Sequence, residues 1–75
     1  MKIRNSAEKD SMEIILTIKR EDIKGDSYFN IMCEEMEAKI SRGSVISRED
    51  DVYISSSSIR EIQRAVSIFI KYKKQ

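Results

Sequence analysis

The sequence predicts a small α+β domain with the element order β-α-β-β-α. Its expected architecture is a three-stranded antiparallel sheet with two helices packed on one face. Three observations predict this fold: apolar alternation over 12–19 with Ile15 as the exception, a helical apolar period in 28–38 and again in 57–75, and two short strand-like segments around the polar loop 48–51. The 75 residues suffice for one domain with a modest core.

Residues 1–11 are polar and mixed in charge, and they lack useful periodicity. We therefore expect a disordered tail there, followed by a single domain over 12–75. The first predicted strand turns Met12, Ile14, Leu16 and Ile18 to one face. Ile15 lies on the other face among polar residues, which suggests contact with a partner.

The first predicted helix runs from about 28 to 38, with Asp26 or Ser27 as its N-cap. Its apolar side contains two methionines and the single cysteine, Cys33, and is interpreted as core. After this helix the apolar period changes from 3.6 to 2, which predicts strands over 39–47 and 52–55 joined as a hairpin. Ser57 or Ser58 can cap the last helix, and Glu61 completes a capping-box pattern with Ser58.

The last helix has more apolar surface than its own domain needs. Its apolar side chains span an arc of about 200°, whereas a surface helix typically shows a stripe of roughly 100°. The surplus predicts a second protein chain; the alternative is a helix buried deeply in its own core. With Ile15, the residues predicted to form this protein interface are Ile62, Ala65, Ile68, Phe69 and Tyr72.

The residue types argue against catalysis by the isolated chain. There is no histidine, the commonest general base and metal ligand, and one cysteine cannot form a usual zinc site. Asp50 and Asp51 are adjacent, but they lie in a predicted hairpin loop, where a solvated turn is the simpler interpretation. We therefore expect no catalytic residues, no metal and no cofactor.

Charge and composition limit the classes of partner that the chain is expected to bind. Charged residues make up 36% of the chain, yet the formal net charge is only +1, which disfavours a strongly basic nucleic-acid binder. The single cysteine and the short apolar runs predict a cytoplasmic protein without a membrane span. A local basic face remains a candidate for nucleic-acid contact, against the alternative of a solvated face, and it contains Arg60, Arg64, Lys71, Lys73 and Lys74.

The segment Val-Tyr-Ile-Ser-Ser-Ser-Ser-Ile-Arg, residues 52–60, joins the last strand to a helix that begins with an apolar-Arg pair. With the apolar positions that follow and the β-α-β-β-α order, this join resembles the Pcc-type small dimerisation subunit of the KEOPS complex. The resemblance covers residues 12–73. The chain departs from the family pattern in the middle of the helix, where Arg64-Ala65-Val66-Ser67 replaces a common Asn-Ser pair.

The resemblance implies a non-catalytic adaptor subunit that dimerises through its sheet, with itself or with a related subunit. It also implies that the two helices dock helices of the subunit that transfers threonylcarbamoyl to adenosine in tRNA, and that any tRNA contact is indirect. Two rival functions remain from the residues alone: a small nucleic-acid-binding βαββα domain acting by itself, and a phage- or plasmid-type protein inhibitor.

Overall fold

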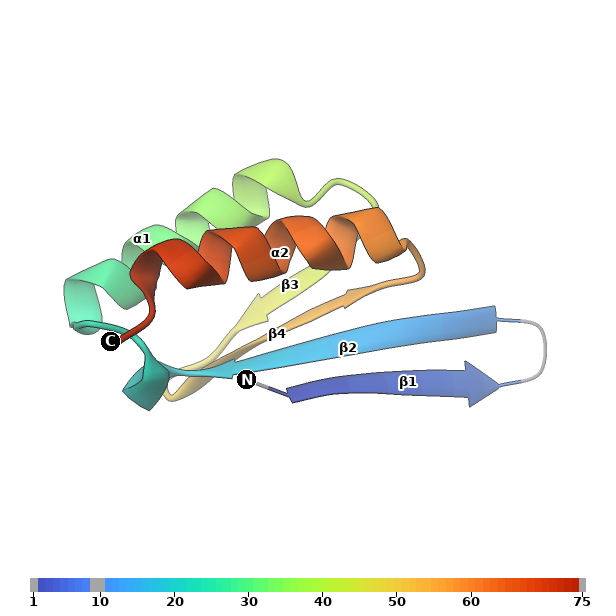
Figure 1. Ribbon diagram of the computed structural model, residues 1–75, viewed down its shortest axis with the longest axis horizontal. Helices are drawn as coiled ribbons and strands as arrows, with labels where there is room; N and C mark the ends of the chain where they lie inside the picture. The colour runs from blue at the N-terminus through green and yellow to red at the C-terminus, as the bar shows by residue number, and fades with distance from the viewer. Residues whose placement is uncertain (1, 9–10, 75) are drawn as a thin grey trace.

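The computed structural model describes residues 2–8 and 11–74, with side chains from residue 13 to residue 74. Two helices lie on one face of an antiparallel sheet whose strand order is β1-β2-β4-β3 (Figure 1). The elements are β1 (Lys2–Glu8), β2 (Ser11–Lys19), the 3-10 turn η1 (Arg20–Asp22), α1 (Asp26–Lys39), β3 (Gly43–Ser47), β4 (Asp51–Ser56) and α2 (Ile59–Tyr72).

From β2 onward the element order is the predicted β-α-β-β-α, and both helices cover the same face of the sheet, so the predicted fold class is confirmed. Residues 2–8 add a further strand, so the sheet has four strands within the described residues instead of the predicted three. The prediction of a disordered tail is therefore wrong for 2–8. An edge strand is held by backbone hydrogen bonds to its neighbour, which require no apolar period, and β1 pairs with β2 from Lys2↔Thr17 to Glu8↔Ser11.

Two element boundaries also differ from the expectation. The first helix begins at Asp26 after Gly25, which provides no side-chain cap, and it continues to Lys39. Ile40 extends the helix's buried side and its amide donates to the carbonyl of Met36, so the strand expected from residue 39 begins only at Gly43. A Cβ at Gly43 would lie 2.9 Å from the Cβ of Ser56, and closer still to the carbonyl oxygen of Ser55. Glycine therefore permits the close pairing at the start of β3.

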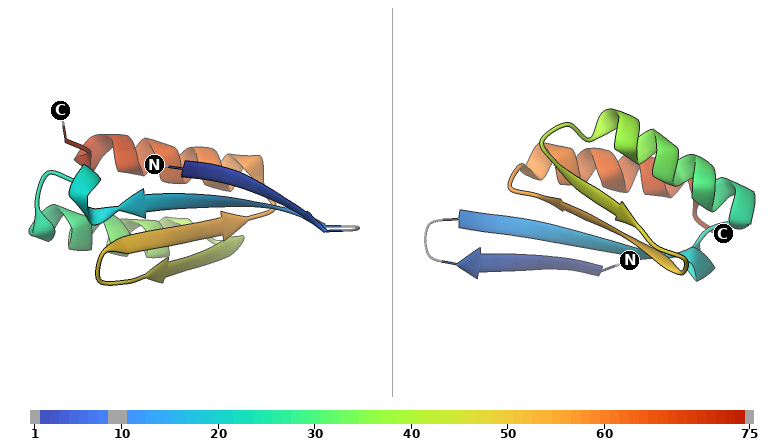
Figure 2. Two further views of the ribbon diagram at one scale, coloured as in Figure 1. Left: turned by 90° about the horizontal axis from the view of Figure 1, so that it is seen from below. Right: turned by 180° about the vertical axis from the view of Figure 1, so that it is seen from behind.

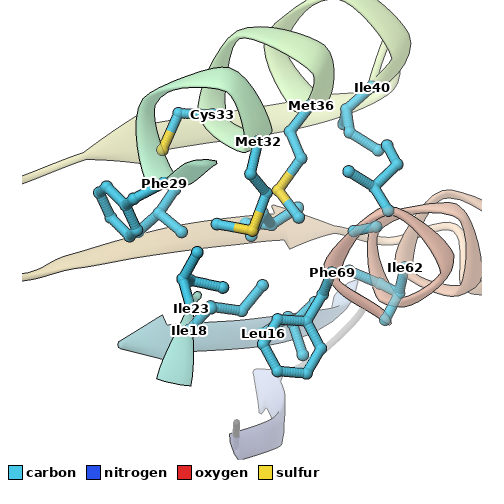
Figure 3. Close-up of a cluster of buried hydrophobic side chains, with 14 residues drawn as sticks. Leu16, Ile18, Ile23, Phe29, Met32, Cys33, Met36, Ile40, Ile62 and Phe69 are labelled. Atoms are coloured by element: carbon cyan, nitrogen blue, oxygen red, sulfur yellow. The ribbon is translucent and has the colours of Figure 1, made fainter. Parts of the chain in front are cut away.

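The alternation of apolar and polar residues along β2 and β4 places the core between the sheet and the helices. Leu16 and Ile18 of β2 and Val52 and Ile54 of β4 point toward the helices and are fully buried. The predicted hairpin is confirmed by the pairing of β3 with β4, including Val45↔Ile54. Figure 3 shows side chains from both helices meeting the strand residues in one cluster, among them Phe29, Met32, Met36, Ile62 and Phe69.

The two helices divide the sheet between them. The first, α1, packs against β3 and α2, whereas α2 packs also against β4 and β2. The views in Figure 2 show that β3 and β1 form the two edges of the sheet and that one face of the sheet carries no helix.

Phe69 tests the placement of α2. Its side chain is 7% exposed and belongs to the core cluster, so Phe69→Ala should lower the free energy of unfolding by roughly 3–5 kcal/mol. The matched control is the next residue, Ile70, which is 56% exposed; Ile70→Ala should change stability by no more than about 0.5 kcal/mol. Urea denaturation of both variants measures the difference. Equal losses would contradict the orientation of α2.

Candidate protein interface

The N-terminus of α2 is fixed by a chain of serine hydrogen bonds. Ser58 is the N-cap, and its Oγ accepts from the amide of Glu61 at 3.5 Å, as the sequence predicted. The amide of Ser58 donates to Oγ of Ser56, which in turn donates to the carbonyl of Arg42. The side chain of Glu61 does not complete the capping box; instead its Oε1 accepts from Ser41 at 3.2 Å, while Oε2 is buried without a partner among the described residues. These bonds set the direction in which α2 leaves β4.

Four of the predicted interface residues lie inside the chain's own core. They are Ile62, Ala65, Ile68 and Phe69, each at most 7% exposed. Burial by the chain's own sheet and first helix removes them from the accessible surface, so the expectation that they contact a partner does not fit this structure. Ile15 and Tyr72 are half-buried.

Ile68 is buried by the first helix. It is 3% exposed although it lies on the flank of the apolar arc, about 160° around α2 from Ile70. Arg64 and Lys71 share this flank and both contact α1: Nη1 of Arg64 donates to the carbonyl of Lys39, and Nζ of Lys71 donates to Glu35. The first helix therefore covers the flank that contains Ile68.

The opposite flank of α2 carries exposed apolar side chains. Ile59 and Ile70 are 60% and 56% exposed, and Val66 is half-buried. At 100° per residue, these three form one row that lies about 145° from the flank covered by α1. We call this set (Ile59, Val66, Ile70) the α2 row. It was part of the predicted 200° arc, but helical periodicity alone does not say which end of an arc a neighbouring helix covers.

The five basic residues predicted on α2 and just beyond it are all exposed, but they do not act alike. Arg64 and Lys71 are engaged with α1, as described above. Among the described residues, no ion pair engages Arg60, Lys73 or Lys74. Lys74 nevertheless lines the hollow at the end of the sheet together with Glu21, Asp50 and Asp51, so acidic side chains lie near that end of α2.

Glu35 on α1 joins the two helices. Its Oε1 accepts from Oη of Tyr72 at 2.7 Å, its Oε2 pairs with Lys71, and Lys39 lies 3.4 Å away. The hydrogen bond from Lys71 and then that from Tyr72 lower the pKa of Glu35 to about 2. The same contact with Glu35 raises the pKa of Lys71 and that of Tyr72. Tyr28 closes the same end of the helix pair, with its ring centre 6.3 Å from that of Tyr72.

The open face of the sheet holds Ile15, Ile46 and Tyr53. Ile46 is 51% exposed and pairs across the hairpin with Tyr53, whose hydroxyl donates to Oδ2 of Asp51 at 2.8 Å. The guanidinium of Arg48 lies 5.6 Å from the Tyr53 ring centre. This face is a mixture of apolar and polar groups, and Ile15 lies on it as the alternation predicted.

The edge strand β3 has no charged residue and no proline in its five residues, Gly43–Ser47. Natural edge strands are usually protected from pairing by lysine, proline, a bulge or a covering element. A shallow groove runs between the end of β3 and α1, and its lining includes Cys33, Glu34, Glu37 and Ser47. The thiol of Cys33 is buried, and burial is the main cause that raises its pKa, as expected for a structural cysteine.

The described residues offer little chemistry beyond these surfaces. No group of three or more His, Cys, Asp or Glu side chains in the described part of the chain could hold a metal ion. A hollow at the end of the sheet is lined by side chains of both charge signs, and Arg20 there pairs with Asp26 at 3.2 Å and donates to the carbonyl of Glu49. No helix among residues 2–8 and 11–74 is long and apolar enough to cross a membrane.

Comparisons with known proteins add little. No family model matches the chain, and no curated protein matches it. Among solved structures it is similar to the LAGLIDADG homing endonuclease I-GzeII, crystallised in complex with its DNA target, at 18% identity and a TM-score of 0.33. The match covers 93% of this chain and 23% of that one. A likeness of this size supports no conclusion about function.

The Glu35 contacts predict a defined pH dependence. A glutamate whose folded pKa is about 2 stabilises the fold above its ordinary pKa of 4.5, and this contribution is lost as the pH falls from about 4.5 toward 2. The hydrogen bond from Lys71 is the main cause of the low pKa of Glu35, so Lys71→Gln should raise this pKa toward its ordinary value. NMR titration of the carboxyl groups measures the pKa of Glu35 in the wild type and in the variant. An ordinary Glu35 pKa in the wild type would contradict the contact between the helices.

Proposed function

We propose that this chain is a non-catalytic dimerisation and adaptor subunit of a KEOPS-like complex that makes threonylcarbamoyl-adenosine on tRNA in the cytoplasm. The observation that carries the proposal is the presence of two separate uncovered surfaces, the β3 edge and the α2 row. An adaptor needs one surface for each neighbour, whereas an isolated domain gains nothing from leaving either open. The name of the complex rests on the resemblance over residues 12–73.

The β3 edge suits a second copy of the chain. A two-fold axis through Val45 would pair β3 with its copy in antiparallel register, with Gly43 opposite Ser47 of the other copy. The groove beside the Ser47 end of the strand is lined by side chains of both charge signs, Glu34 and Glu37 together with Arg20 and Arg48. The pairing would therefore rest on the backbone groups of the two edges and not on charge. The same edge would accept a related subunit with a similar strand.

The surfaces of the two helices suit the helices of a larger partner. Ile31 on α1 is 46% exposed, and the α2 row adds a second set of apolar side chains on the same layer. Apolar side chains gathered on helices pack favourably against other helices. This use of the layer agrees with the docking that the resemblance implies.

The rival with an observation in its favour is nucleic-acid binding, because Arg60, Lys73 and Lys74 are free to contact phosphates. The apolar row beside these cations favours protein instead. The salt dependence of binding distinguishes the two functions. The affinity for nucleic acid falls between 50 and 200 mM salt, by on the order of tenfold for every few phosphate contacts, whereas the affinity of an apolar protein interface does not.

Dimerisation has a direct test at β3. Ile46→Lys adds a charge at an exposed position of the edge strand, so the variant should be monomeric where the wild type is dimeric at micromolar concentration. Ser57→Lys adds the same charge in the exposed turn before α2 and should leave the dimer intact. Light scattering after size-exclusion chromatography measures both. A wild type that stays monomeric, alone and with related subunits, would contradict the dimerisation role.

The adaptor role is tested by recovering the tagged chain from its native host at moderate salt, with mass spectrometry of the retained proteins. We expect a threonylcarbamoyl-transferring subunit among them. Recovery of nucleic acid with no such subunit would favour the rival function.

A further inference from the structure

The strand β1 forms the second edge of the sheet. It pairs with β2 along one side, and no strand among the described residues pairs with its other side. The helices pack mainly against β2, β4 and β3, and β1 lies at the rim of the sheet (Figure 2). The backbone groups along the outer side of β1 are therefore open to a further strand.

The charges of β1 are separated along the strand. Lys2 and Arg4 lie in its first half, and Glu8 is its last residue. Their register partners on β2 are all uncharged, namely Thr17, Ile15 and Ser11. The strand is thus basic at one end and acidic at the other, and β2 places no opposite charge directly across from these residues.

This separation favours one register for antiparallel pairing of β1 with a second copy. A two-fold axis at Asn5 would place Lys2 opposite Glu8 of the second copy at both ends, and it would pair all seven residues of the strand. An axis at Arg4 would bring that residue opposite its own copy, and an axis at Ser6 would pair fewer residues. Charge on an edge strand usually discourages pairing. On β1 it selects a strand of the same sequence running in the opposite direction.

We propose that the outer edge of β1 is a self-association site that takes the same edge of a second copy. This inference goes beyond the proposed function, which places self-association at the β3 edge. The β1 contact rests on backbone pairing and exposed charges, so we expect it to be weak and to form at submillimolar concentration. Because the chain would then have two different two-fold contacts, wild-type dimers joined at β3 would join further through β1 into linear assemblies.

Other occupants fit the β1 edge less well. A nucleic-acid backbone would be attracted by Lys2 and Arg4 but repelled by Glu8. An unrelated strand would gain the backbone hydrogen bonds, but its charges would match those of β1 only by coincidence. A second copy is the occupant whose charges match at both ends of the strand.

The test isolates the β1 edge in the Ile46→Lys variant, in which pairing at β3 is blocked. Analytical ultracentrifugation at submillimolar concentration should show a monomer–dimer equilibrium. Adding Glu8→Lys should weaken this dimer by about tenfold, because lysines then oppose each other at both ends of the contact. Adding Lys2→Glu as well should restore the dimer, since the opposite charges are then exchanged. The control Glu34→Lys makes the same change in net charge on α1, over the other edge of the sheet, and should leave the dimer unchanged.

Salt provides an independent measurement that needs no further substitution. Raising the salt concentration from about 0.1 M to about 1 M shortens the screening length from about 10 Å to about 3 Å, so the dimer of Ile46→Lys should weaken. Thermal midpoints in dilute solution show whether each variant still folds. An Ile46→Lys variant that stays monomeric at submillimolar concentration would overturn the proposal. So would a dimer that is unchanged by salt or by Glu8→Lys, or one that the exchange of charges does not restore.

These outcomes separate the β1 contact from the proposed function. A wild-type dimer at micromolar concentration that Ile46→Lys abolishes, with no association at higher concentration, would overturn only the β1 proposal. A wild type that is monomeric at micromolar concentration but forms a charge-dependent dimer at submillimolar concentration would overturn only the role of the β3 edge.

Discussion

Burial of one face of the strand β4 is the constraint on which the rest of the structure depends. Val52 and Ile54 are fully buried beneath the helices, and β4 is the strand that pairs with β2 on one side and β3 on the other. The five-residue edge strand β3 is held by its pairing with β4 and by α1, which packs against it. The helices bury this face of β4 with α2 over β4 and β2 and with α1 beside it over β3. This arrangement leaves the β3 edge and the α2 row uncovered.

The position of the first helix explains why α2 faces as it does. Sheet packing buries Ile62, Ala65 and Phe69, but it does not by itself decide which flank of the helix is covered next. The order of strands β4 and β3 decides that flank, because α1 lies over β3, and Glu35 of α1 then accepts from Tyr72 and pairs with Lys71 there. Ile68 is buried as a consequence, and the α2 row is left facing away from α1. The charged contact is at the surface and adds little stability alone, so it accompanies this arrangement of the helices and does not determine it.

The fold could be predicted from the sequence because each of its main elements shows an apolar period. Alternation in β2 and β4 and the 3.6 period of both helices each point to one buried face, and those faces agree with one another. The N-cap of α2 could be narrowed to Ser57 or Ser58 because a serine side chain accepts from an amide of the first helical turn, and Ser58 makes that bond. The strand β1 could not be predicted, because an edge strand is specified by backbone pairing with β2 and its residues show no apolar period. The start of β3 at Gly43 could not be predicted either, because it depends on the close contact of Gly43 with Ser55 and Ser56 on β4.

The candidate site followed the sequence only in part, and the reason is geometric. Of the residues chosen from the apolar arc of α2, Ile62, Ala65 and Phe69 lie near its centre and are buried, and Ile68 lies on the flank that α1 covers. A helix that packs on a sheet and beside a second helix loses two adjacent sectors of its surface. The sector that remains accessible is at the end of the arc opposite the second helix, where Ile59 and Ile70 lie. The position of that sector depends on which side α1 occupies, a tertiary property set by the order of strands β4 and β3. The β3 edge and the α2 row therefore lie on opposite sides of the helix pair, so a partner at one surface need not obstruct a partner at the other.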